Sequence, residues 1–230
     1  MKYDHLFFDL DGTLWDFGAN SKQTLSEIFI NEDLQEKGIP GFDDFFEVYS
    51  YINQKLWALF RESQIEKEEL SWKRFNDSLL QFKIDDVEMA KRMSVAYITE
   101  SPRKTILMEG AIELLNYLYE KYQLHILTNG FTEVQYPKIE NSGLKRYFTH
   151  VITSAEAGFL KPSPSIFEYA MKKTGAIPEK SLMIGDDAEV DCAGARSAGW
   201  DAIFLNPNST STENTENYQI RRLSELKKLL

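Results

Sequence analysis

The chain is poor in the residues that form disulfides, thiolate metal sites and basic binding surfaces. It has one cysteine, Cys192, among 230 residues, so an internal disulfide is excluded and a site with several thiolates cannot form. Acidic residues outnumber basic ones by 36 to 26, which gives a net charge of −10. No segment gathers the basic residues into a stripe that could follow a phosphate backbone, so we expect no nucleic acid polymer as a partner.

Long apolar runs are missing as well. The first ten residues, MKYDHLFFDL, contain an apolar run too short and too acidic for a signal peptide, and no stretch reaches the roughly 20 apolar residues that cross a bilayer. We therefore expect a soluble, cytoplasmic protein without a membrane partner. A hydrophobic fraction of 43% allows a substantial core, in one large domain or in two unequal ones.

Short apolar blocks alternate with helical patterns over much of the chain. Each block is too short for a helix and ends in small or polar residues, as a buried strand does. This alternation predicts a parallel sheet with helices on both faces, an α/β core of the Rossmann-like kind. The predicted strands are 5–8, 124–130, 150–156, 181–187 and 201–207, and the predicted helices are 109–122, 132–143 with an interruption at Pro137, 163–175, 188–199 and 223–230.

Residues 16–105 break this alternation. Their apolar residues recur at helical spacing, as in the series Phe42, Phe45, Tyr49 and Ile52, which predicts an all-α insertion of about four helices. The predicted domains are therefore a core of residues 1–15 and 106–230 and an inserted helical cap of residues 16–105, joined by two linkers that would allow a hinge. The polar stretch 206–217 is predicted to be a mobile loop.

Polar side chains follow several of the predicted strands at their carboxyl ends. Ligands of an open parallel α/β sheet bind outside these ends, so we expect the side chains to form one site. Lys161 belongs to the loop after the third strand, and Asp191 lies one helical turn beyond the fourth. The residues at the strand ends themselves are Asp9, Asp11, Thr128, Asn129, Asp186 and Asp187.

Clustered carboxylates indicate a metal-assisted reaction. Several carboxylates repel one another unless a cation is present, and hard oxygen ligands without nearby cysteine or paired histidine favour Mg²⁺ over zinc. If the metal and Lys161 neutralise the oxygens of a phosphoryl group, a carboxylate can attack phosphorus and form an aspartyl-phosphate. Asp9, at the strand tip, is the predicted nucleophile. Asp11 points to the same side of an extended chain and is predicted to protonate the leaving oxygen and later deprotonate a water.

Four short segments carry a family resemblance. In chain order, DLDGT (9–13), LTNG (127–130), KP (161–162) and GDDAEVD (185–191) resemble the four motifs of the haloacid dehalogenase (HAD) superfamily. The resemblance implies a helical cap that closes over the site and selects the substrate. It also implies a catalytic pair (Asp9 and Asp11), phosphate-binding residues (Thr128, Asn129 and Lys161), Mg²⁺ ligands (Asp9, Asp186 and the carbonyl of Asp11) and supporting acids that act through water or orient neighbours (Asp187 or Asp191).

A longer stretch narrows the range of expected substrates. DGTLWDFGANS (11–21) resembles the pyrimidine 5′-nucleotidases of this superfamily, which implies a Mg²⁺-dependent hydrolase of nucleoside monophosphates such as dUMP, UMP and dTMP. Trp15 and Phe17, near the predicted hinge, are candidates to line the substrate pocket. The partner is then a small-molecule phosphomonoester, and we expect a monomer or a homodimer.

Other interpretations remain open at this point. The nearest is another capped phosphatase or a mutase that acts on a phosphosugar or phosphoglycolate. A non-catalytic phosphoacceptor module is a different class, and the acid at Asp11 argues against it because such a group speeds dephosphorylation. A 2-haloacid dehalogenase is disfavoured by the presence of both Asp11 and Asp186, and a calcium loop by the position of Gly12 directly after the second aspartate.

Overall fold

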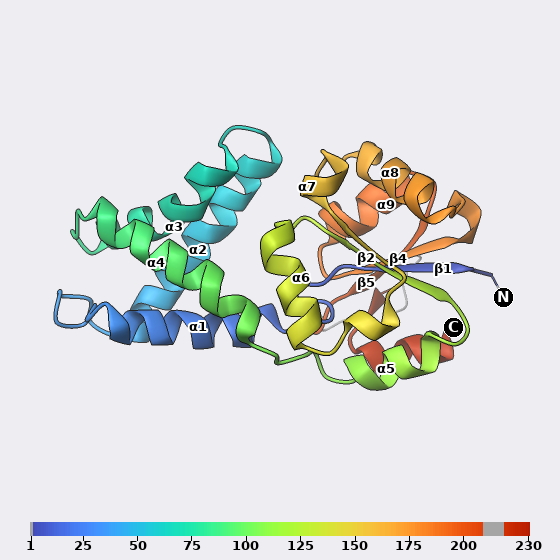
Figure 1. Cartoon of the computed structure of the whole chain (residues 1–230), viewed down its shortest axis with the longest axis horizontal. Helices are drawn as coiled ribbons and strands as arrows, with labels where there is room; N and C mark the ends of the chain where they lie inside the picture. Colours follow the sequence, from blue (N-terminus) through green and yellow to red (C-terminus); the bar gives the residue numbers. More distant parts are fainter. Residues whose placement is uncertain (1, 209–218) are drawn as a thin grey trace. The chain divides into compact units, whose positions relative to one another are not determined.

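The computed structural model describes residues 2–208 and 219–230, so most of the predicted loop 206–217 lies outside the described residues. The chain divides into two compact units, one formed by Met1–Phe17 with Thr105–Leu230 and the other by Gly18–Lys104 (Figure 1). Each unit has its own hydrophobic core, and the two are described separately below.

The first unit is built on a parallel sheet. Its strand order is β3-β2-β1-β4-β5-β6, and every pairing among the described strands is parallel. The predicted α/β fold with a parallel sheet is therefore confirmed. The strands are β1 (His5–Phe8), β2 (Gln123–Thr128), β3 (His150–Thr153), β4 (Ser181–Gly185), β5 (Asp201–Leu205) and β6 (Gln219–Ile220).

Side-chain alternation along the strands separates two cores. Leu6 and Phe8 of β1 pack into one hydrophobic cluster, while Phe7 between them packs into the other. Both faces of the sheet are therefore buried, which explains why the strands appear in the sequence as nearly continuous apolar blocks. β1 lies between β2 and β4, so its carboxyl end opens at the middle of the sheet.

Helices cover both faces of this sheet. One core includes side chains of α5 (Ala111–Leu118), α6 (Thr132–Asn141) and the 3₁₀ segment η5 (Leu223–Lys228). The other includes side chains of α7 (Ser154–Ala157), α8 (Pro164–Thr174), the π-helical segment η4 (Ala188–Ala193) and α9 (Gly194–Ser197). Figure 1 shows α5 on one side of the strands and α8 and α9 on the other. Short 3₁₀ turns complete the unit at η2 (Lys145–Tyr147) and η3 (Pro178–Lys180).

Three predicted elements differ from those in the structure. Residues 154–156, the end of the predicted strand 150–156, belong to α7 instead, because the Thr153 hydroxyl accepts a hydrogen bond from the Glu156 N–H and starts a helix. Residues 188–199 are two pieces, η4 and α9, rather than one helix. The segment 223–230 is a 3₁₀ helix over Leu223–Lys228. By contrast, α6 continues through Pro137.

The second unit is all-helical. It contains α1 (Phe17–Asn31), α2 (Phe42–Arg61), α3 (Lys67–Gln81), α4 (Val87–Glu100) and the short turn η1 (Ser101–Arg103), which agrees with the predicted insertion of about four helices. All four helices contribute to one core, which includes Phe29, Phe45, Tyr49, Phe75 and Met93. None of the helices in the described part of either unit combines the length and apolar character that a membrane span needs.

Candidate active site

The carboxyl end of β1 carries a buried ion-pair network. Asp9 directly follows this strand, and its Oδ1 accepts a hydrogen bond from Lys161 Nζ at 2.7 Å. The same Nζ donates to Asp191 Oδ1 at 2.6 Å and to the Leu127 carbonyl, at the end of β2, at 2.8 Å. All three charged residues are at most 8% exposed. Lys161 therefore uses its three N–H groups on Asp9, Asp191 and Leu127.

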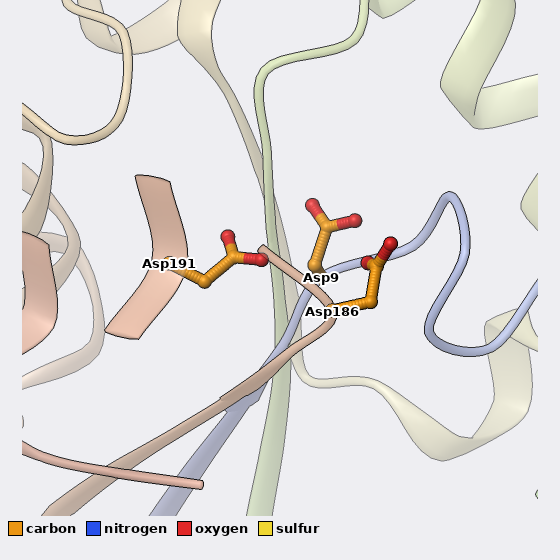
Figure 2. A group of neighbouring side chains, drawn as sticks. All are labelled: Asp9, Asp186 and Asp191. Carbon is orange, nitrogen blue, oxygen red and sulfur yellow. The ribbon is translucent and has the colours of Figure 1, made fainter. Parts of the chain in front are cut away.

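Asp186 joins this network from the end of β4. The Thr13 hydroxyl donates to Asp186 Oδ1 at 2.8 Å. A Cβ on Gly12 would lie 2.3 Å from Asp186 Oδ2, and the φ of Gly12 is +84°, so only glycine fits at this turn. Asp9, Asp186 and Asp191 each offer a carboxylate oxygen, and these oxygens lie within 4.8 Å of one another (Figure 2).

Burial and mutual repulsion perturb these carboxylates. Burial raises the pKa of Asp9 well above its usual value, opposed by Lys161 and reinforced by the Asp191 and Asp186 charges. Desolvation raises the pKa of Asp186 to about 6, opposed by its hydrogen bond from Thr13. Burial alone would lower the pKa of Lys161, but the Asp191 and Asp9 carboxylates raise it above the usual lysine value. The site therefore favours a bound cation close to its carboxylates.

The donor set fits a hard divalent cation. Carboxylate oxygens are the ligands that Mg²⁺ uses in proteins, whereas zinc sites draw on cysteine and histidine. The group of Asp9, Asp186 and Asp191, found among the described residues, contains no cysteine and no histidine. Lys161 donates to both Asp9 and Asp191, and the Asp187 N–H also donates to Asp191 Oδ2, so both oxygens of Asp191 are already bonded within the protein.

The second aspartate of the first motif is held by a different element. Asp11 Oδ1 accepts a hydrogen bond from Lys138 Nζ at 2.7 Å, and Asp11 Oδ2 accepts one from Gln135 Nε2 at 2.8 Å. Both donors belong to α6. The Lys138 ammonium also lies 4.1 Å from the centre of the Trp15 ring.

The end of β2 supplies a hydroxyl and an amide. Thr128 Oγ1 accepts hydrogen bonds from the Gly130 N–H at 3.1 Å and from Gln135 Nε2 at 3.0 Å. Its two acceptor positions are thus used, and its own proton remains available to an anionic ligand. The Asn129 side chain bonds both backbone groups of Lys161: its Oδ1 accepts from the N–H at 2.7 Å, and its Nδ2 donates to the carbonyl at 2.9 Å.

The other residues singled out in the sequence lie in different surroundings. Asp187 Oδ1 accepts from the N–H groups of Glu189 and Val190 and so caps η4. Trp15 is fully buried in the core of the first unit, and Phe17 is partly buried against it. Of the two acids predicted to support the site, Asp191 contacts Lys161, whereas Asp187 bonds the backbone of η4.

Gln135 and Lys138 were not identified from the sequence. They lie three residues apart on α6 and contact the two oxygens of one carboxylate, as neighbours on a helix face can. The signal available in the sequence was their spacing inside a helical pattern that follows TNG. Thr13, the last residue of the motif DLDGT, was also given no role, although it donates to Asp186.

Comparison with known proteins assigns the family. The family model for haloacid dehalogenase-like hydrolases matches residues 3–199. The chain belongs to this family. The predicted resemblance is confirmed, and this HAD-like hydrolase has relatives that match it over nearly its full length.

Two of these relatives are pyrimidine 5′-nucleotidases. YjjG of Escherichia coli is 30% identical over 100% of this chain and 99% of its own length, and PynA of Streptococcus pneumoniae is 32% identical over 98% and 94%. A crystal structure of YfnB from Bacillus subtilis bound to magnesium matches with a TM-score of 0.88 and 30% identity, covering 100% of this chain and 99% of that one. The HAD-like hydrolase is thus related to phosphatases that act on small phosphorylated molecules.

Proposed function

We propose that this HAD-like hydrolase is a Mg²⁺-dependent phosphomonoester hydrolase that acts through an aspartyl-phosphate on Asp9. The observation that carries the proposal is the arrangement around Asp9. One oxygen of this buried carboxylate is fixed by Lys161, and Asp186 and Asp191 lie beside it. A fixed carboxylate next to a cation is suited to attack the phosphorus of a phosphate that the same cation attracts.

The proposed reaction has two steps. An oxygen of Asp9 attacks phosphorus, the bond from phosphorus to the leaving oxygen breaks, and Asp11 gives its proton to that oxygen. Asp11 then takes a proton from a water as this water attacks phosphorus, and the bond between phosphorus and Asp9 breaks to release phosphate. Thr128 donates to a phosphoryl oxygen and Lys161 lends it positive charge, while Asn129 holds the backbone of Lys161 in place.

We assign the metal ligands to Asp9, Asp186 and the carbonyl of Asp11. When bound, Mg²⁺ supplies positive charge that offsets the repulsion between carboxylates and phosphate. Asp191 supports the site by holding Lys161, and Asp187 supports it by capping the segment that carries Asp191. This division of roles agrees with the different surroundings of the two acids.

We further propose that pyrimidine nucleoside 5′-monophosphates such as dUMP, UMP and dTMP are the substrates. Two lines support this choice: the resemblance of residues 11–21 to pyrimidine 5′-nucleotidases and the full-length similarity to YjjG and PynA. The alternative is a phosphosugar or phosphoglycolate phosphatase of the same family, which would use the same chemistry at Asp9 and differ in what it recognises beyond the phosphate.

A phosphate-release assay tests both parts of the proposal. The purified protein is offered pyrimidine and purine monophosphates, sugar phosphates and phosphoglycolate, with Mg²⁺ or with EDTA. We expect Mg²⁺-dependent release that is fastest with pyrimidine monophosphates, and no release by the Asp9→Asn variant. Turnover in EDTA, or full activity of Asp9→Asn, would contradict the mechanism, whereas faster release from a sugar phosphate would contradict only the substrate.

A further inference from the structure

We propose that Gln135 and Lys138 are positioning residues that hold the Asp11 carboxylate in its acid/base orientation and link it to the phosphate-binding hydroxyl of Thr128. This inference rests on the proposed phosphatase function. It assigns a task to α6, an element that carries none of the four sequence motifs.

Both oxygens of Asp11 are held from the same helix. Lys138 donates to Oδ1 and Gln135 to Oδ2, at 2.7 and 2.8 Å. Two donors on two oxygens fix the rotation of the carboxylate about its Cβ–Cγ bond, which a single donor would leave free. Each oxygen keeps a second lone pair, so a proton can still pass to or from a substrate.

Gln135 also connects Asp11 with Thr128. Its Nε2 has two protons, one for Asp11 Oδ2 and one for Thr128 Oγ1. The orientation of the amide follows from chemistry, because only its N–H side can face a carboxylate. The donor that orients the acid therefore also occupies an acceptor position of Thr128, and this directs the Thr128 proton toward a ligand.

The glycine of TNG makes room for this bridge. A Cβ on Gly130 would lie 1.7 Å from Gln135 Nε2, far closer than any non-bonded contact allows. Gln135 is only 1% exposed, and its Nε2 is bonded to Asp11 and Thr128, so moving away from such a Cβ would break these hydrogen bonds. The glycine of TNG is thus needed for Gln135 of α6 to reach Asp11 and Thr128.

The buried ammonium of Lys138 is paired with Asp11. Lys138 is 3% exposed, and its ammonium lies over the face of Trp15. A buried ammonium is costly unless it is paired, so its presence needs a reason. One explanation is that Lys138 orients the Asp11 carboxylate, which moves protons in the proposed reaction. The competing explanation is that the ion pair only stabilises the packing of α6 against the segment after β1.

Leaving groups distinguish these two explanations. Hydrolysis of UMP expels an alkoxide, which needs a proton from Asp11, whereas p-nitrophenyl phosphate expels a phenolate that is stable without one. The ratio kcat/KM covers only the steps up to departure of the leaving group, so the later use of Asp11 as a base does not enter it. Misplacing Asp11 should therefore lower kcat/KM for UMP and leave kcat/KM for p-nitrophenyl phosphate nearly unchanged.

The test uses Lys138→Met and Gln135→Leu, which keep the size of each side chain and remove its donors. We expect kcat/KM for UMP to fall by about 10- to 100-fold and that for p-nitrophenyl phosphate by less than about threefold. Lys138→Arg, which keeps the cation, should recover part of the loss. Lys172→Met, a change at an exposed lysine of α8, is the matched control and should leave both values unchanged.

A double-mutant cycle checks that Lys138 acts through Asp11. In an Asp11→Asn background, Lys138→Met should lower kcat/KM for UMP by less than about a further threefold, since the carboxylate that Lys138 orients is already absent. Equal losses on both substrates, or a full further loss in that background, would show a merely structural role and overturn the inference. If the unaltered protein releases no phosphate from either compound, it is the proposed function that fails first.

Discussion

Lys161 shows how one side chain serves both folding and the proposed chemistry. It is buried, and its charge is balanced by the carboxylates of Asp9 and Asp191. Such a group cannot be removed without leaving buried carboxylates unpaired. The cation that we propose to attract a phosphate is therefore also one that stabilises the folded state.

Lys161→Met should destabilise the protein as well as inactivate it. We expect the free energy of unfolding in EDTA to fall by about 3 kcal/mol, since the variant leaves Asp9 and Asp191 without their common partner. Denaturant unfolding followed by circular dichroism measures this. Lys172→Met, at an exposed position, should change it by less than about 0.5 kcal/mol. A Lys161→Met protein as stable as the unaltered one would show that the network contributes nothing to the fold.

Gly130→Ala should reproduce the loss of Gln135 without changing any charged group. The new Cβ would overlap Gln135 Nε2 and push the amide away from Asp11 and Thr128. We expect kcat/KM for UMP to fall by about tenfold or more, as a small misplacement of catalytic groups does. Gly41→Ala is the control, because a Cβ there meets only the flexible end of Asp44 at 3.3 Å. Unchanged activity of Gly130→Ala would mean that Gln135 need not stay in place.

The sequence is informative about site residues that lie next to one another in the chain. Asp9, Asp11 and Asp186 belong to short motifs at strand ends, and Lys161 to a short motif in the loop before α8, so the type of residue and its position in the fold can be inferred together. Gln135 and Lys138 reach Asp11 from the packed face of a helix, and that contact depends on how α6 sits against β1. Packing of this kind has no short-range signature, so these two residues emerged only from the structure.

At the scale of elements, three strands carry an adjoining row of histidines. His125 on β2 is fully buried, its Nε2 lies 3.0 Å from His5 Nδ1 on β1, and its ring centre is 5.3 Å from that of His150 on β3. Burial, reinforced by the nearby His5 and His150, lowers the pKa of His125 to about 3. His125 is therefore neutral in the folded protein at every pH near neutrality.

This row should make the protein sensitive to acid. Unfolding exposes His125 and returns its pKa to about 6.5, so below that pH the unfolded state binds a proton that the folded state does not. Between about pH 7.5 and about pH 5 the unaltered protein should lose about 2 kcal/mol more free energy of unfolding than His125→Asn does. Urea titrations at several pH values measure the difference, to which other titrating groups contribute equally in both proteins. Parallel pH profiles for the two proteins would contradict the assignment.

Regular elements were easier to predict than short or irregular ones. β1 and β4 are continuous apolar blocks because both faces of the sheet are covered, and this pattern is visible in the sequence. The two-residue β6 is too short to leave such a pattern. The break of 188–199 into η4 and α9 was hidden because it depends on tertiary contacts. Its first turn is widened where the Asp187 carbonyl accepts from both Asp191 and Cys192, while the Asp191 side chain is held by Lys161.

For the whole molecule, metal binding should appear as stability. An ion that binds the folded protein and not the unfolded one stabilises it by about 2.7 kcal/mol at a hundredfold excess over its Kd. We expect Mg²⁺ to raise the midpoint of thermal unfolding and EDTA to reverse the rise. Asp186→Asn should abolish the response, and Asp187→Asn, a change at the residue that caps η4, should keep it. If Mg²⁺ does not change the midpoint of thermal unfolding of the unaltered protein, the proposed metal site is contradicted.

The chain leaves the first unit and returns to it through segments that are tied together. Trp15 bridges to Leu107, the Asp16 N–H donates to the Ile106 carbonyl, and the Met108 N–H donates to the Leu14 carbonyl. The two ends of the helical unit are thus anchored side by side by the sheet-bearing unit itself. Because the entropy of closing a loop grows only slowly with its length, a longer or shorter insertion between these anchors changes the stability of the sheet-bearing unit little. A different insertion between these anchors would therefore leave the carboxylates proposed to react in their places at the ends of the strands.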